Sequence, residues 1–241
     1  MRALFISDLH LSTDSPRTVA AFTAFLAGPA RKADALYILG DLFEYWAGDD
    51  DADEPVAAAA ATALAACAAT GTRIHFMAGN RDFLLGESYA ARAGISLLAD
   101  PRLIECDGLR LLLSHGDRLC TDDHAYQRYR QQVRDPAWQA DFLARPLAER
   151  KAFIAELRQR SRSEKASKSM AIMDVNPDAV ADLLRAHDYP VLIHGHTHRP
   201  AIHTLLVDGQ PCTRHVLHDW DRQPGWLCCE QGRLTSHLIE A

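Results

Sequence analysis

Five short apolar runs, separated by helical or polar segments, constrain the fold of this 241-residue chain more than any other feature. They are ALFIS at 3–7, ALYIL at 35–39, IHFMA at 74–78, LRLLLS at 109–114 and VLIH at 191–194. Because their apolar residues follow one another without alternation, the runs are typical of strands buried on both faces. Helical stretches at 18–27 and in the alanine-rich segment 56–69 separate the first three runs. This alternation predicts a layered α/β protein.

Two further parts of the chain depart from this rhythm. After Pro200, TLLVDGQPCTRHVL and GWLCCEQGRLTSHLIEA are typical of antiparallel strand pairs that turn at Asp208-Gly209 and Gln231-Gly232. Between the fourth and fifth runs, residues 124–170 are rich in charge and in helix-forming residues. We therefore expect one domain over residues 1–241, with a helical insertion at about 124–170.

Residue types that bind metals follow each of the five predicted strands. The motifs are SDLH after the first run, GDLFE after the second, GNRD after the third, HGD after the fourth and HGHTH at the end of the fifth. In open α/β sheets, ligands bind beyond the carboxyl ends of the strands. Each motif alone is common in surface turns, but five of them at strand ends predict a single site. The residues expected to meet there are Asp8, His10, Asp41, Asn80, His115, His196 and His198.

These oxygen and nitrogen donors suit two hard or borderline divalent ions, and the absence of cysteine argues against a zinc–thiolate site. His194 belongs to the strand end, and we expect it to have a structural or orienting role. Glu44 and Asp117 are further candidates for orienting the ligands. For an HxHxH motif in isolation, the alternative is a polar turn that contains histidines by accident.

Taken together, the motifs DxH, GDxxE, GNRD, HGD and GHTH resemble those of the calcineurin-like metallophosphoesterase superfamily over residues 5–200. The resemblance implies a two-sheet α/β/β/α sandwich with a dinuclear metal centre. It assigns one ion to Asp8, His10, Asp41 and His198. It assigns the other to Asp41, Asn80, His115 and His196, so that Asp41 bridges the two. Two such ions, usually manganese in this superfamily, can generate a hydroxide and hold a phosphoryl oxygen.

A closer resemblance covers almost the whole chain, including the insertion. The segments GDLFEYWAGDD, MAGNRDFLLG, LSHGDRLCTDD, SKSMAIMDVN and IHGHTHRP look like those of the bacterial family that cleaves UDP-2,3-diacylglucosamine in lipid A synthesis. This resemblance implies two Mn²⁺ per chain and attack of a metal-bound hydroxide on the α-phosphorus. The products would be UMP and 2,3-diacylglucosamine 1-phosphate (lipid X). The protein would be cytoplasmic and peripheral on the cytoplasmic face of the inner membrane, where it meets the inner leaflet.

The same resemblance implies roles for individual residues. Those with catalytic roles are Asn80, Arg81, His115 and His196. Those that contact the substrate are Asn80, Arg81, Asp123, Ser161, Lys165, Lys168 and His196. Tyr126 is a further candidate in the same pocket.

Arg81 favours a pyrophosphate over a simple ester as the substrate. Many members of the superfamily have GNHE or GNHD, whose histidine can protonate an alkoxide leaving group, whereas this chain has GNRD. Arginine cannot act as a general acid, but its fork of donors suits a phosphate. A phosphate leaving group, with a second pKa of about 6, does not need such an acid. The alternative is a purely structural arginine.

The insertion adds a second argument, because its charge differs from that of the rest of the chain. Residues 145–168 contain eight Lys or Arg and three Glu, whereas the whole chain has a net charge of −6. The spacing of Tyr126, Tyr129 and Val133 predicts an amphipathic helix. One interpretation is a cap that packs on the sandwich and exposes a solvated basic face. The other, favoured by the resemblance, is a cap with an apolar groove for acyl chains and cations that face phosphates or anionic headgroups.

Composition excludes several classes of protein. The negative net charge argues against a general nucleic-acid binder. The apolar run at residues 3–6 is too short for a signal peptide, and no run reaches the length of a membrane span. We expect a monomer. Two alternatives to the lipid hydrolase stay open: another metallophosphoesterase, such as a nucleotidase or cyclic-nucleotide phosphodiesterase, and a metal-site scaffold that binds partners without catalysis.

Overall fold

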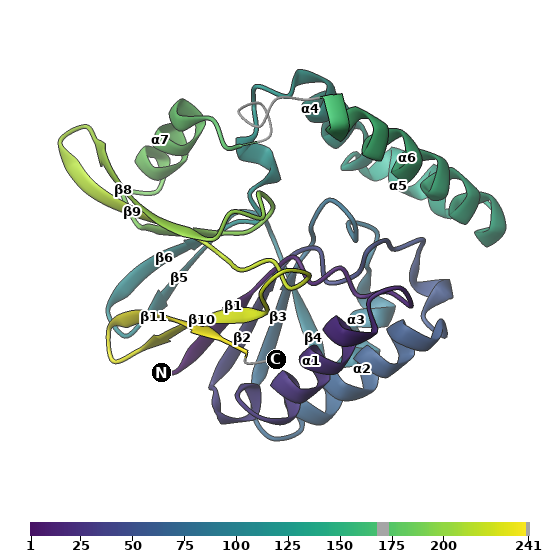
Figure 1. Ribbon diagram of the computed structural model, residues 1–241, viewed down its shortest axis with the longest axis horizontal. Helices are drawn as coiled ribbons and strands as arrows, with labels where there is room; N and C mark the ends of the chain where they lie inside the picture. The colour runs from purple at the N-terminus through teal and green to yellow at the C-terminus, as the bar shows by residue number, and fades with distance from the viewer. Residues whose placement is uncertain (168–173, 240–241) are drawn as a thin grey trace.

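Two β-sheets pack face to face in the computed structural model of the protein (Figure 1). The structure describes residues 1–167 and 174–239, and over 160–167 it describes the backbone alone. The first sheet has the order β11-β10-β1-β2-β3-β4 and the second β5-β6-β7-β9-β8. The strands of the first sheet are β1 (Ala3–Ile6), β2 (Ala35–Leu39), β3 (Arg73–Met77), β4 (Ile95–Leu98), β10 (Gly225–Glu230) and β11 (Arg233–Leu238). Those of the second are β5 (Arg102–Cys106), β6 (Leu109–Leu113), β7 (Val191–His194), β8 (Ala201–Val207) and β9 (Gln210–Val216).

Side chains of β1 alternate between two apolar clusters, as the pleat of a strand requires. Ala3 and Phe5 face the second sheet, in a cluster that also contains residues of β6 and β7. Leu4 and Ile6 point the other way, into the cluster beneath the helices. The continuous apolar runs therefore do mark strands that are buried on both faces.

Helices cover the outer face of each sheet. α1 (Pro16–Ala27), α2 (Pro55–Ala68) and α3 (Glu87–Ala93) lie on the first sheet, where their buried residues join the cluster of Leu4 and Ile6. α7 (Pro177–Ala186) covers the second sheet and packs Leu184 against Leu112 and Leu192. Figure 1 shows these two layers of helices on opposite sides of the paired sheets. The predicted α/β/β/α sandwich is confirmed.

The turns that close the two C-terminal hairpins lie at the predicted places. β8 and β9 turn at Asp208-Gly209, and β10 and β11 turn at Gln231-Gly232. Both residues of each turn have positive φ, which is typical of tight two-residue hairpin turns. Three elements that were not predicted lack a clear sequence pattern: α3 has only seven residues, and β4 and β5 are edge strands with exposed residues. α7 was also not predicted.

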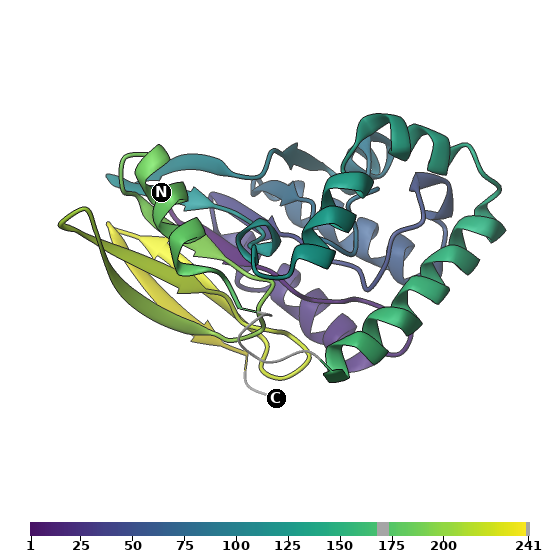
Figure 2. The same cartoon turned by 90° about the horizontal axis from the view of Figure 1, so that it is seen from above.

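The insertion forms three helices, α4 (His124–Val133), α5 (Pro136–Leu143) and α6 (Leu147–Ser167), which stand apart from the sheets as a separate group (Figures 1 and 2). Asp123 caps α4 and Asp135 caps α5 by accepting hydrogen bonds from the first backbone N–H groups. Phe142 stacks on Trp138 and contacts Phe153, and all three join the cluster beneath α1–α3. The apolar side of the insertion thus packs on the sandwich. In the described part of the chain, no helix has the length and apolar character needed to cross a membrane.

Replacing Phe142 with alanine should destabilise the protein strongly. Phe142 is 1% exposed, whereas its neighbour Leu143 is 40% exposed. Removing a buried phenylalanine costs about 3–5 kcal/mol, so urea unfolding of Phe142→Ala should show a loss of that order. Leu143→Ala is the matched control and should change the free energy of unfolding by less than about 1 kcal/mol. Equal losses in the two variants would contradict the packing described for α5.

Candidate metal centre

Loops from both sheets bring Asp8, His10 and His198 together. Asp8 and His10 follow β1 of the first sheet, and His198 follows β7 of the second. His198 Nε2 lies 3.4 Å from His10 Nε2 and 3.6 Å from Asp8 Oδ1. The three residues offer ligand atoms within 4.8 Å of one another, as a shared metal ion requires.

A second group lies on the other side of Asp41. Asn80 Oδ1 is 2.9 Å from His115 Nε2 and 2.8 Å from His196 Nδ1. Asp41 Oδ1 lies 3.8 Å from His115 Nε2, while Asp41 Oδ2 lies 3.8 Å from His10 Nε2. The two oxygens of one carboxylate therefore face the two groups. All seven residues expected at the site are brought together, and Asp8, expected at one ion only, also lies within reach of Asp41 and His115.

Partners at Nδ1 orient three of the imidazoles, two of them through hydrogen bonds and His10 through a close carboxylate. His115 Nδ1 donates to the carbonyl of Leu39 at 2.8 Å, and His198 Nδ1 donates to Asp219 Oδ2 at 2.9 Å. His10 Nδ1 lies 2.9 Å from Glu44 Oε2. When Nδ1 of an imidazole carries the proton, Nε2 is left as the metal ligand. In all three rings Nε2 is the atom that faces Asp41, Asp8 or Asn80.

The backbone of these loops is held in an unusual conformation. Ten non-glycine residues of the described chain have positive φ, and five of them are Asp8, His10, Asp41, His196 and His198. Such conformations cost about 1–3 kcal/mol each and persist only where the surrounding structure imposes them. The remaining five lie away from these loops, several of them in turns. Such a concentration of left-handed residues is typical of functional sites.

Two glycines allow the loops to approach one another. A Cβ on Gly195 would collide with the side chains of Ser7 and Asp8, and a Cβ on Gly79 would collide with Asp41. The backbone NH of His196 can therefore reach Asp8, at 2.9 Å from Oδ2. The backbone NH of Arg81 likewise donates to Asp41 Oδ1 at 2.8 Å.

Buried carboxylates make the site strongly negative. Asp8 and Asp41 are 0% and 2% exposed. Burial opposes ionisation of Asp41, but the charges of His115, His10 and Arg81 hold its pKa below the usual range. Burial also acts to lower the pKa of His10, yet Glu44, Asp41 and Asp8 raise it to about 9. A site that draws a proton this strongly favours cations, and its oxygen and imidazole donors fit divalent metal ions.

Two supporting residues were not predicted from the sequence. Asp219 follows β9 rather than one of the five motif-bearing strands, yet it is buried and orients His198. Asp82 is fully buried and accepts hydrogen bonds from the backbone NH groups of Gly79 and Leu42. Asp82 belongs to the GNRD motif, but its role depends on the loop after β2, whose backbone it binds.

The residues expected to contact the substrate differ in their hydrogen bonds and in whether the structure describes them. Nε of Arg81 is buried and has no hydrogen-bond partner among the described residues. The ring of Tyr126 stacks on His196 at 5.9 Å, while its hydroxyl donates to Asp117 at 2.7 Å. Asp123 accepts a hydrogen bond from the NH of Tyr126. The side chains of Ser161 and Lys165 on α6, and the whole of Lys168, lie outside the described residues.

His194 does not face the two groups. It is fully buried, and its ring contacts the carbonyl of Gly195 at 2.8 Å and Arg214 at 3.0 Å. Burial, together with the charge of Arg214, lowers the pKa of His194 to about 3. The carboxylate of Asp117 accepts hydrogen bonds from Tyr126 and Arg130 of α4, so Asp117 holds the insertion in place.

Asp219→Asn should weaken metal binding through His198. Loss of a carboxylate that orients a ligating imidazole typically reduces metal affinity by about 10–100-fold. Calorimetric titration with Mn²⁺ should show this reduction for one of two ions. Asp221→Asn removes an exposed carboxylate two residues away and serves as the control. Equal Mn²⁺ affinity in Asp219→Asn and Asp221→Asn would contradict the orienting role.

Comparison with known proteins agrees with this geometry. The model of the calcineurin-like phosphoesterase family matches residues 1–200. The UDP-2,3-diacylglucosamine hydrolase of Aromatoleum aromaticum is 62% identical, over 94% of this chain and 92% of its own. Proteins of the same name from Aeromonas hydrophila and Escherichia coli are each 50% identical, covering 99% and 91% of this chain and 100% and 91% of their own. With these relatives and the paired ligand groups around Asp41, the chain belongs to the calcineurin-like phosphoesterase family.

Proposed function

We propose that this protein hydrolyses the pyrophosphate bond of UDP-2,3-diacylglucosamine and releases UMP and 2,3-diacylglucosamine 1-phosphate, a step of lipid A synthesis. The observation that carries the proposal is Asp41, whose two oxygens face two ligand groups next to Arg81, an arginine whose Nε is buried. Relatives that are 50–62% identical over nearly the whole chain bear the name of this hydrolase.

In this proposal each ligand group holds one Mn²⁺. Asp8, His10, Asp41 and His198 would bind the first ion. Asp41, Asn80, His115 and His196 would bind the second. Carboxylate oxygens and imidazoles are ligands that Mn²⁺ accepts. When bound, two such ions supply Lewis acidity that activates water and neutralises charge on phosphoryl oxygens.

The residues of the chain itself would orient the α-phosphorus for attack by a hydroxide derived from water. Arg81 would donate to a phosphoryl oxygen, because its Nε is buried without a partner among the described residues and its backbone is fixed to Asp41. Asn80, His115 and His196 would act beside it at the reacting phosphoryl group. The leaving group is a sugar phosphate of low pKa, so no side chain has to protonate it.

The helices of the insertion would form the cap that receives the diacylglucosamine part, within one domain over residues 1–241. Asp123, Tyr126, Ser161, Lys165 and Lys168 would contact the substrate together with Asn80, Arg81 and His196. Tyr126 would offer its ring, because its hydroxyl is bound to Asp117. A substrate with two acyl chains resides in a membrane, so we propose peripheral contact of a cytoplasmic monomer with the inner leaflet.

Hydrolysis of the lipid nucleotide should depend on added metal. With UDP-2,3-diacylglucosamine in detergent micelles, chelated protein should release no UMP, and Mn²⁺ should restore release. His198→Ala should abolish it. A cyclic nucleotide and a nucleoside monophosphate are the comparison substrates. Faster cleavage of either than of the lipid nucleotide would favour another phosphoesterase activity, and Mn²⁺ binding without any cleavage would favour a scaffold.

Arg81→Ala should reduce kcat/KM by about 10²–10³-fold, because it removes a donor to the charge that develops on the phosphoryl group. The measurement is the initial rate of UMP release at saturating Mn²⁺. Arg92→Ala removes an exposed arginine that pairs with Asp53 and should leave the rate unchanged. A structural arginine would show itself if Arg81→Ala lowered the melting temperature but kept the rate per folded molecule.

A further inference from the structure

One carboxylate joins the insertion to a predicted metal ligand. Arg158 of α6 donates to Glu44 Oε1 at 2.7 Å, and Glu44 Oε2 lies 2.9 Å from His10 Nδ1. His10 in turn directs Nε2 toward Asp41 and His198. The contacts therefore run without a break from α6 to the first ligand group.

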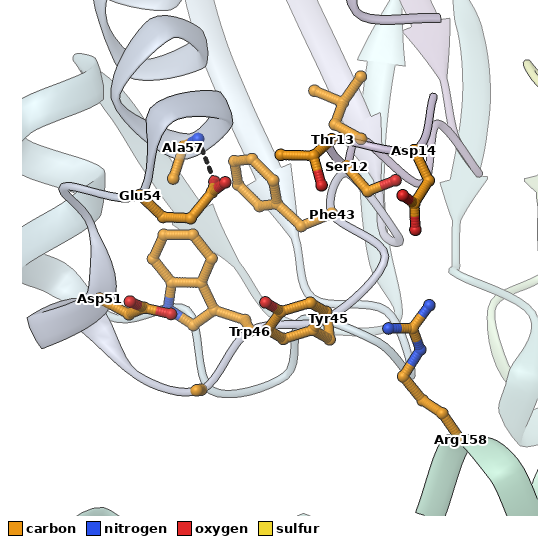
Figure 3. A pocket seen from close by; sticks show the side chains of 12 residues that line it. Ser12, Thr13, Asp14, Phe43, Tyr45, Trp46, Asp51, Glu54, Ala57 and Arg158 are labelled. Atoms are coloured by element: carbon orange, nitrogen blue, oxygen red, sulfur yellow. Dashed lines mark hydrogen bonds between the residues drawn. The ribbon is translucent and has the colours of Figure 1, made fainter. Parts of the chain in front are cut away.

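Arg158 is held in place on its other side as well. Its guanidinium lies 5.4 Å from the centre of the Tyr45 ring, a distance typical of cation–π contact. Figure 3 shows Arg158 reaching from α6 toward the loop that carries Tyr45 and Trp46. There it lines a pocket of about 220 Å³ that also includes Leu11, directly after His10. Arg158 is thus fixed against the same two loops that carry His10 and Glu44.

The neighbouring ion pairs of α6 do not extend to the metal centre. Arg150 pairs with Asp50 and also bonds to the carbonyl of Ala47, and Lys151 pairs with Asp51 at 2.7 Å. Asp50 and Asp51 are not among the predicted ligands or the groups that orient them. Of the ion pairs between described side chains of α6 and the segment 44–51, only the one at Glu44 also touches a predicted ligand.

Glu44 uses one oxygen to bind Arg158 of α6 and the other to contact His10, so the position of α6 affects His10. A carboxylate is planar, so a shift of the oxygen that Arg158 holds also shifts the oxygen that faces His10. Outer partners of ligating histidines set the orientation of the ring and the affinity for the metal. Displacement of α6 would therefore release Glu44 and loosen the ring of His10.

We propose that Arg158 is a positioning residue that couples the docking of α6 to metal binding at His10, through Glu44. The inference rests on the proposed function in one respect, since it needs the metal ion of the first ligand group. Coupling between two binding events is reciprocal. If docked α6 strengthens metal binding, the bound ion strengthens the docking of α6 by the same factor. The cap would then dock most tightly when the metal site is occupied.

Calorimetric Mn²⁺ titration of the full chain, without substrate, tests the first half of this coupling. Glu44→Gln should weaken binding of one ion by about 10–100-fold. Arg158→Gln should weaken the same ion by a smaller factor, about 3–10-fold, because Glu44 remains. In the double variant the losses should not add, since Arg158 acts through Glu44. Lys151→Gln removes a cation from the same helix and should stay within about twofold of the unchanged protein.

Hydrogen exchange of the backbone amides in residues 147–159 tests the second half. Mn²⁺ should slow this exchange in the unchanged protein and in Lys151→Gln, but much less in Arg158→Gln. A merely structural Arg158 would speed exchange equally with and without Mn²⁺. Unchanged Mn²⁺ affinity in Arg158→Gln, or additive losses in the double variant, would overturn the inference. Tight, coupled Mn²⁺ binding without hydrolysis of the lipid nucleotide would instead overturn the proposed function and leave this inference standing.

Discussion

Asp8 and Asp41 bury two carboxylates at the edge where the sheets meet, and the surrounding structure compensates their charge. Removing an ionised carboxylate from water costs several kcal/mol unless cations or donors surround it. Here the backbone NH groups of Arg81 and His196 donate to the two carboxylates, and His10 and His115 lie beside them. The same negative charge that has to be compensated is what gives the site its affinity for metal ions.

The two sheets divide the ligands between them, so the site depends on the core that joins the sheets. Asp8, His10, Asp41 and Asn80 follow strands of the first sheet, whereas His115, His196 and His198 follow strands of the second. Phe5 of β1 packs against Leu113 and Ile193, the residues just before the histidine-bearing loops. Loose packing there would move one half of the ligand set relative to the other. The apolar runs therefore hold the two sheets in register, and the motifs that follow the runs supply the ligands.

Much of this arrangement follows from local sequence. Continuous apolar runs predict buried strands, and strands that end in polar residues predict a site at one edge of the sheets. Asp219 could not be predicted in the same way, because only the β8–β9 hairpin and the chain beyond it bring Asp219 to His198. The left-handed backbone of Asp8 and Asp41 also depends on contacts between loops that are distant in sequence. α3 has only seven residues, and β4 and β5 are edge strands with exposed residues, so they lack the continuous apolar runs of the predicted strands.

The ion pairs of the insertion could not be predicted from the sequence either. Its charge and helical character are visible in the sequence, but the partner of each cation is not. Arg150, Lys151 and Arg158 are similar in sequence context, yet they pair with Asp50, Asp51 and Glu44, and only Glu44 touches a predicted ligand. Such pairings depend on how the helix lies across loops that are about a hundred residues away in sequence.

The most direct test of the account is to locate the metal ions by anomalous diffraction from crystals soaked in Mn²⁺. Two peaks about 3.5–4 Å apart are expected, one beside each oxygen of Asp41. The first should lie next to Nε2 of His10 and His198, and the second next to His115 and Asn80. A single peak, or peaks away from Asp41, would contradict the bridging role on which the proposed chemistry depends.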